Sequence, residues 1–157
     1  MGRKTEYQPE KGDKRQPCVK DETNPKWKNI TPAHEKLWIW QKANKLYLEI
    51  GKLSELFPAK EKYNLTSQVT RSAKSIKDNI AEGNESYYYN DKIKGFYTAR
   101  KETGETQNHI REMMDKEYIA SQKGQDMIDE YEEVKRGING IVRTTCAKRD
   151  VRKKAKE

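Results

Sequence analysis

The chain has 157 residues, about the length of one domain, and its 32% hydrophobic and 37% charged residues are lean for a chain that is packed throughout. It holds no apolar run near 18 residues and begins with a polar segment, which excludes a transmembrane helix and a secretory signal. Its two cysteines, Cys18 and Cys146, lie far apart and predict no disulfide framework. We therefore expect a cytoplasmic protein that does not associate with membranes.

The first 30 residues are polar, of mixed charge and without a period, and they contain three of the five prolines. Such a segment cannot bury enough apolar surface to offset the cost of ordering, so we predict that residues 1–30 are a disordered extension. Trp27 and Ile30 are the exceptions and are candidates for docking on the folded part.

A first helix is predicted over residues 32–57. Thr31 supplies a capping hydroxyl, Pro32 suits the first helical position, and Pro58 ends the segment. Apolar residues recur at steps of three and four, which places them on one helical face: Ile39, Ala43, Leu46, Ile50, Leu53 and Phe57.

The second and third helices are predicted over 62–86 and 91–117 with the same spacing. The stripe of the second consists of Leu65, Val69, Ser72, Ala73, Ile76, Ile80 and Gly83, and its small members allow a neighbouring helix to approach closely. The stripe of the third consists of Ile93, Phe96, Ala99, Thr103, Thr106, Ile110 and Met113. Gly95 and Gly104 each cost about 1 kcal/mol relative to Ala in a helix interior, so this helix is expected to form because it packs.

A fourth helix is predicted over 121–147, with Ser121 as its cap and residues 148–157 as a basic tail into which the helix can continue. Its stripe consists of Met127, Tyr131, Val134, Ile138, Ile141 and Thr145. Four amphipathic segments with short links predict an all-α fold, an antiparallel up-down-up-down four-helix bundle over 31–147, with a disordered N-terminal extension and a basic C-terminal tail.

The formal net charge of +8 is concentrated outside the predicted bundle. Residues 1–32 hold eight Lys/Arg and five Asp/Glu, and residues 143–157 hold seven and two, which leaves 33–142 neutral. A basic tail attracts polyanions by releasing their condensed counterions, although cations at a helix end also complement its dipole and aid solubility. Under the first interpretation the nucleic-acid-binding residues are Arg143, Lys148, Arg149, Arg152, Lys153, Lys154 and Lys156.

Four polar residues of the second and third predicted helices, Arg71, Asn79, Glu82 and Glu105, are expected to meet in a polar network between helices or subunits. The alternative, a buried acid used in chemistry, has little support because neither Glu102 nor Glu105 is followed by a His at the spacing of a di-metal site. No phosphate loop, metal spacing or nucleophile–base pair is present. We expect no catalytic residue, no metal and no cofactor, and hence no enzyme.

Three consecutive tyrosines, Tyr87 to Tyr89, lie in the predicted link between the second and third helices. Aromatic rings beside positive charge can stack on unpaired bases. The alternative is that they cover the end of the bundle or form an oligomer contact.

Several short motifs recur in one known family in the same order. Residues 37–43 read Leu-Trp-Ile-Trp-Gln-Lys-Ala, residues 63–68 read Tyr-Asn-Leu-Thr-Ser-Gln after a Phe-Pro pair, and residues 79–83 read Asn-Ile-Ala-Glu-Gly. Over about residues 35–145 the chain resembles the four-helix-bundle family encoded in intervening sequences of bacterial large-subunit ribosomal RNA genes.

The resemblance implies a four-helix bundle that assembles into a homopentamer, and it implies no particular activity. The broader group includes the accessory variability determinant of diversity-generating retroelements, a basic pentameric bundle that binds a reverse transcriptase and its template RNA. The charge distribution and the resemblance therefore predict two possible functions. The first is a non-enzymatic oligomer that binds RNA or DNA through its basic extensions, and the alternative is an accessory scaffold for a reverse transcriptase.

Overall fold

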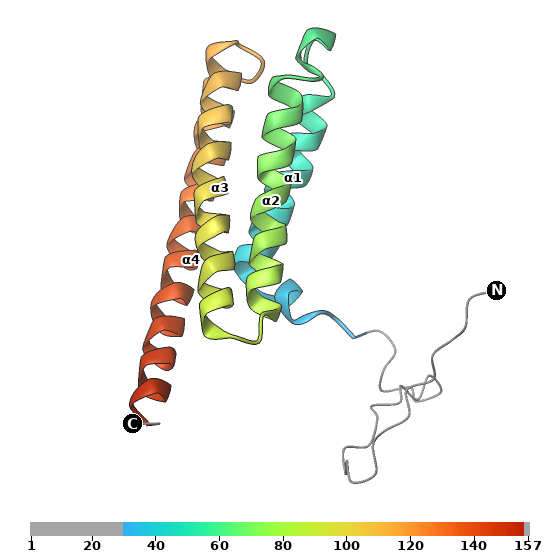
Figure 1. Cartoon of the computed structure of the whole chain (residues 1–157). Helices are drawn as coiled ribbons and strands as arrows, with labels where there is room; N and C mark the ends of the chain where they lie inside the picture. Colours follow the sequence, from blue (N-terminus) through green and yellow to red (C-terminus); the bar gives the residue numbers. More distant parts are fainter. Residues whose placement is uncertain (1–29, 156–157) are drawn as a thin grey trace, which may run out of the picture. The chain divides into compact units, whose positions relative to one another are not determined.

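The computed structural model describes residues 30–155, in which four α-helices and two short 3-10 helices follow one another without a strand (Figure 1). Their bounds are η2 (Ala33–Lys36), α1 (Trp38–Ser54), η3 (Ala59–Glu61), α2 (Leu65–Glu85), α3 (Tyr89–Asp115) and α4 (Ser121–Lys154). The all-α prediction is confirmed. The predicted extension, including Trp27, lies outside the described residues except for Ile30.

The apolar stripes form one core among the four helices. Every predicted stripe residue of α2 and α3 is buried, as are the first four of α1, whereas Leu53 and Phe57 are partly exposed. On α4 the prediction is wrong at one position, because Val142 is buried and Ile141 is half-buried. Both residues continue the spacing of three and four from Ile138 to Thr145, so periodicity alone could not choose between them.

The closest approach between helices occurs where α2 meets α3. A Cβ on Gly95 would lie 2.8 Å from the Cα of Gly83, so only glycine fits there. This contact fixes how far α2 and α3 are shifted along each other. In the resulting register Thr106 Oγ1, farther along α3, donates to Ser72 Oγ of α2 at 2.8 Å. The close contact expected from the small residues of α2 is therefore observed, and α2 and α3 run in opposite directions (Figure 1).

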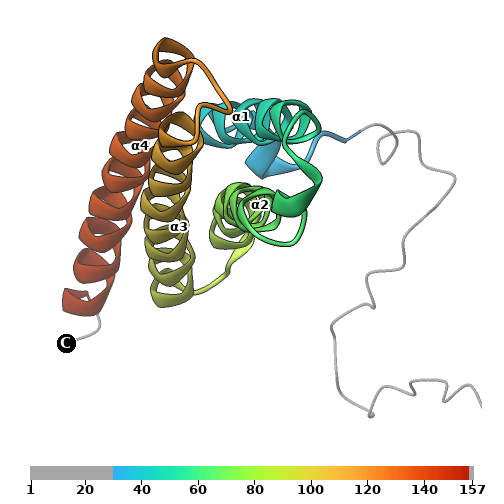
Figure 2. The same ribbon diagram turned by 90° about the horizontal axis from the view of Figure 1, so that it is seen from above.

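The α1–α4 edge combines one apolar contact with a row of ion pairs. A Cβ on Gly137 would lie 2.4 Å from Ile39 and 2.5 Å from Trp38, so this glycine lets α1 settle against α4. Beside it, Lys42 pairs with Glu133, Lys45 with Glu130 and Lys123 with Glu49. Exposed ion pairs contribute little individually, so the apolar contact positions this edge. Figure 2 shows the four helices nearly end-on for α1 and α2 and obliquely for α3 and α4.

The predicted bounds of the first helix, 32–57, need correction at both ends. The first segment is interrupted at Leu37, whose extended backbone (φ −76°, ψ 122°) separates η2 from α1. This break lets His34 contact Trp40 and Glu85, with ring centroids 5.3 Å apart in the first case and Nδ1 3.2 Å from Oε1 in the second. At its other end α1 stops at Ser54, before the residue that Pro58 restricts.

The remaining helices also differ from the predicted ranges. Helix α2 begins at Leu65 and ends at Glu85, α3 spans Tyr89–Asp115, and α4 continues to Lys154. Residue Ala120 precedes α4 and no side chain caps it, so the capping role expected of Ser121 is wrong. The helix continues into the predicted basic tail, as the sequence allowed, because residues 148–154 contain neither Gly nor Pro and are mostly good helix formers. None of the helices described is both long and apolar enough to cross a bilayer.

Candidate nucleic-acid interface

The last part of α4 is helical but carries no core residue. From Cys146 to Ala155 no residue is buried, and Val151 is 70% exposed. Figure 1 shows this part of α4 running on past the α2–α3 turn. It has the regular spacing of a helix and presents most of its side chains to solvent.

Cations dominate this end of α4. Arg143, Lys148, Arg152, Lys153 and Lys154 are exposed, Arg149 is half-buried, and Lys156 lies outside the described residues. Arg149 pairs with Asp150 at 3.0 Å, which raises the pKa of the arginine. Among residues 30–155 the five exposed cations form no ion pair, so their charge is available to an anionic ligand. The last three also complement the C-terminal helix dipole.

The turn between α2 and α3 lies against this basic helix. Arg149 Nη1 donates to Asn90 Oδ1 at 3.3 Å, which joins α4 to the start of α3. In the turn itself Tyr87 and Tyr88 are 86% and 68% exposed, and their rings meet edge to face with centroids 5.1 Å apart. Aromatic rings and unpaired cations that are distant in sequence therefore occupy one end of the bundle.

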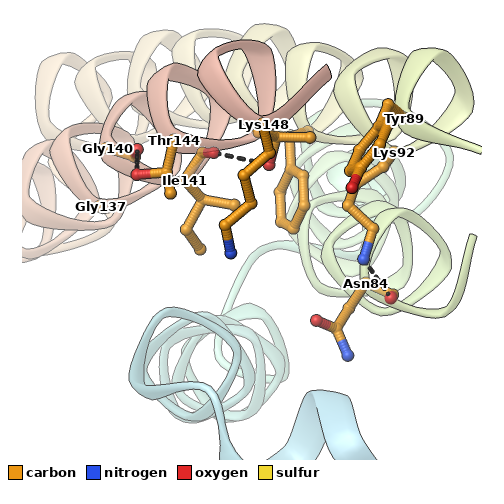
Figure 3. Close-up of a pocket in the computed structure, with 10 residues that line it drawn as sticks. Asn84, Tyr89, Lys92, Gly137, Gly140, Ile141, Thr144 and Lys148 are labelled. Atoms are coloured by element: carbon orange, nitrogen blue, oxygen red, sulfur yellow. Dashed lines mark hydrogen bonds between the residues drawn. The ribbon is translucent and has the colours of Figure 1, made fainter. Parts of the chain in front are cut away.

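A cavity of about 530 Å³ opens at the same end, between the end of α2, the start of α3 and the second half of α4 (Figure 3). Lys92 Nζ donates to the Asn84 carbonyl oxygen at 2.9 Å on one side, and Lys148 extends toward the cavity on the other. Gly140, which also lines the cavity, leaves open space, since a Cβ there would meet nothing within 4 Å. The lining is thus polar and cationic on two sides.

Tyr89 connects this cavity with a shallower one of about 370 Å³ along the end of α4. The second cavity is lined by Lys148 and Arg152 and by the apolar side chains of Val151 and two alanines. Together the two hollows follow one side of α4 from Gly137 to Ala155, and Lys148 and Arg152 are the cations on that side. Sequence reasoning found the cations and the tyrosines separately, but it did not connect Lys92 with them and missed Asn84 and the two hollows.

The predicted polar network is not assembled within the chain. Arg71 and Glu105 line one small hollow and Asn79 and Glu82 line another, and among residues 30–155 no hydrogen bond or ion pair joins any of the four to another. Asn79 instead donates to Ser75, at 2.8 Å to its carbonyl oxygen. Arg71 and Asn79 are eight positions apart, which separates them by about 12 Å along the helix, too far for direct contact.

A different buried polar cluster joins η3 to the α3–α4 turn. The Glu61 carboxylate, 4% exposed as a residue, accepts from Lys116 Nζ at 3.0 Å, from Tyr118 OH at 2.9 Å and from the Leu65 N–H at 3.4 Å. The Lys116 hydrogen bond, with the other two, holds the pKa of Glu61 below its usual range. The one signal in the sequence was that Glu61 lies four residues before the start of α2, where a carboxylate can accept from a backbone N–H. Because the Glu61 carboxylate binds side chains of the α3–α4 turn, the cluster holds η3 and that turn together.

The histidines have separate surroundings. His109 is buried on α3, neither ring nitrogen has a hydrogen-bond partner among the described residues, and Glu105 Oε1 lies 3.6 Å from Nε2. His34 lies beside Glu85, the last residue of α2, and not beside His109. Within residues 30–155 no three His, Cys, Asp or Glu residues are grouped as metal ligands would be.

Comparison with known proteins places the fold. Residues 35–140 match the sequence model of the 23S rRNA-intervening sequence protein family. A crystal structure of a protein of unknown function from the S23 ribosomal protein family, from Bacteroides thetaiotaomicron VPI-5482, is similar with a TM-score of 0.62 and 23% sequence identity, covering 67% of this chain and 95% of that chain. A search of curated proteins gives no match.

The family match ends at residue 140, so the basic part of α4 lies beyond it. The relation to the accessory variability determinant remains an expectation from the resemblance. The match covers the bundle from the end of η2 to the middle of α4, more than half of the chain. The chain therefore belongs to the 23S rRNA-intervening sequence protein family.

Proposed function

We propose that this protein is a non-enzymatic, oligomeric bundle that binds nucleic acid, RNA in the first place, through the basic end of α4. The observation that carries the proposal is a group of five exposed cations on α4 without acidic partners among the described residues, four of which lie beyond Thr145, the last buried residue of the helix. The core does not require α4 to extend beyond Thr145. The positive charge of this extension is complementary to a phosphate backbone.

Electrostatics gives the proposal a measurable form. Each Lys or Arg that neutralises a phosphate releases counterions, so the affinity falls as salt rises, with a slope of about −0.7 per contact for a single strand. In an oligomer, which the resemblance suggests is a pentamer, several basic helices act on one nucleic acid at high effective concentration. Weak single contacts then add up to useful affinity.

The experiment compares two variants of equal charge. The first carries Lys148→Gln, Arg152→Gln, Lys153→Gln and Lys154→Gln, changes that keep helix propensity. The control carries Lys52→Gln, Lys60→Gln, Lys62→Gln and Arg111→Gln, four exposed cations near the other end of the bundle. Binding of a labelled RNA, and of DNA of the same sequence, is measured by fluorescence anisotropy at several salt concentrations.

The α4 variant should lose most of its affinity, and its dependence on salt should become shallower by up to about 3 units of slope. The control should resemble the wild type. Equal behaviour of the two variants would show that net charge, and not the end of α4, governs binding. Light scattering on the same samples measures the oligomer. The reverse-transcriptase scaffold stays a prediction from the resemblance, since no feature of the described residues favours it.

A further inference from the structure

The α2–α3 turn brings two exposed aromatic rings to the basic end of α4. We infer that the nucleic acid bound there is single-stranded: unpaired bases stack on Tyr87 and Tyr88 while the backbone follows Lys148 and Arg152. The inference rests on the proposed function and names its ligand more narrowly.

The first support is the placement of the turn. The Arg149–Asn90 hydrogen bond holds α4 beside the start of α3, two residues from Tyr88. Tyr89 lines both hollows together with Lys148, and the shallower hollow also includes Arg152. A strand lying along Lys148 and Arg152 therefore passes Tyr89, the residue that follows Tyr88.

The second support is the exposure of the rings. Tyr87 and Tyr88 are more than two-thirds exposed and contact each other edge to face, so at least one ring face is open to a ligand. Every base has a flat π-face, and base–aromatic stacking tolerates any sequence. A duplex hides its base faces inside its stack and offers this surface only phosphates. Stacking rings therefore favour a single strand over a duplex.

The third support is the cavity beside Tyr89. Its volume of about 530 Å³ lies in the range of small-ligand sites, about 300–1,000 Å³. Lys92 uses one of its three ammonium donors on Asn84, and Lys148 forms no ion pair with a described residue. An unpaired nucleotide next to the base stacked on Tyr88 can therefore enter this cavity and contact its two cations. A nucleotide within a continuous duplex could not enter the cavity.

The test uses the full-length protein with Tyr87→Ala and Tyr88→Ala combined. The matched control is Tyr63→Ala, because Tyr63 is 87% exposed and lies beside a cation, Lys62 Nζ 5.3 Å from its ring centroid, in the α1–α2 link at the other end of the bundle. The probes are a labelled RNA without self-complementarity and the same strand annealed to its complement. Affinity is measured by anisotropy across a salt series.

The wild type should prefer the single strand. The Tyr87/Tyr88 variant should lose about tenfold or more in affinity for it, with the duplex affinity and the salt slope unchanged, because no charge is removed. The Tyr63 variant should match the wild type.

Other results overturn the inference in distinguishable ways. If the tyrosine variant keeps its single-strand affinity while the α4 glutamine variant loses it, the proposed function stands and the stacking surface does not exist. If neither variant weakens binding, both proposals fail. A changed mass in light scattering for the tyrosine variant would assign the rings to a contact between subunits.

Discussion

Arg149, near the end of α4, donates a hydrogen bond from Nη1 to Oδ1 of Asn90, the second residue of α3, at 3.3 Å. The two residues are 59 positions apart in the chain. Because the last part of α4 has no buried residue, this bond is a specific tie between that part and the rest of the bundle. It also sets the tyrosine turn beside the cations.

Replacing Asn90 with Ala removes the acceptor and leaves every charge in place. Because the bond is exposed, the free energy of unfolding should change by less than about 0.5 kcal/mol. Local opening of the helix end should become easier, so the amide hydrogens of residues 148–154 should exchange several-fold faster. Hydrogen–deuterium exchange with mass spectrometry measures this, and Asn108→Ala, an exposed position on the same helix, is the control. Unchanged exchange would mean that the bond does not order α4.

The Gly83–Gly95 contact predicts opposite effects for two glycines of α3. Gly95→Ala places a Cβ 2.8 Å from the Gly83 backbone, so the helices must separate, and stability should fall by about 1–3 kcal/mol. Gly104→Ala meets nothing within 4 Å and should raise stability by about 1 kcal/mol, because alanine has the higher helix propensity. Urea unfolding followed by circular dichroism measures both. Destabilisation by both changes would contradict this account of the helix crossing.

The Glu61 cluster predicts a pH dependence of stability. The pKa of Glu61 is lowered in the folded chain, chiefly by the hydrogen bond from Lys116, so its contribution is complete above the ordinary glutamate pKa of about 4.3. That contribution is lost as the pH falls through the lowered folded pKa. Glu61→Gln should therefore lower the melting temperature by a few degrees at pH 7, and the difference from the wild type should shrink on acidification.

Melting curves between pH 7 and pH 3 measure this effect. Glu55→Gln is the control, because Glu55 is an exposed acid near the same end of the bundle. A difference between wild type and Glu61→Gln that stays constant with pH would show that the charge of Glu61 is not what fastens the turns.

The end of α3 offers a stabilising substitution. Glu117 has a φ of 57°, and its N–H and that of Tyr118 donate to the carbonyls of Met114 and Met113 at 2.9 Å each. This is the Schellman arrangement, in which the left-handed residue is usually Gly because a Cβ costs about 1–2 kcal/mol there. Glu117→Gly should raise the free energy of unfolding by about 1 kcal/mol. Denaturant titration measures it, and destabilisation would show that the Glu117 side chain contributes more than its backbone strain costs.

Much of the fold follows from the spacing of apolar residues. A stripe such as Ile39, Ala43, Leu46 and Ile50 can be buried only on one helical face, so helix type and core membership could be predicted without knowing what the stripe packs against. The choice between Ile141 and Val142 could not, because both continue the period. The break at Leu37 has no sequence signal, since it depends on contacts that His34 makes after folding.

The candidate site was predicted in pieces. The cations of α4 and the tyrosines could each be identified from residue type, but their meeting depends on the direction of α3 and on the length of α4. The contacts within the polar network could not be predicted for the same reason: positions on α2 show which side a residue faces and not which atoms lie opposite. A network between subunits stays a prediction. The Glu61 cluster was not predicted because Lys116 and Tyr118 lie 55 and 57 positions from Glu61 in the chain.

The sequence by itself determined four amphipathic helices, a neutral bundle and a surplus of cations at its end, because hydrophobic periodicity and charge are properties of neighbouring residues. Only the tertiary structure decided that the basic end of α4 lies against the start of α3, next to the tyrosine turn, with a cavity between Lys92 and Lys148. Contacts of this kind join residues distant in the chain, and they are set by how closely helices pack, as Gly83 against Gly95 illustrates.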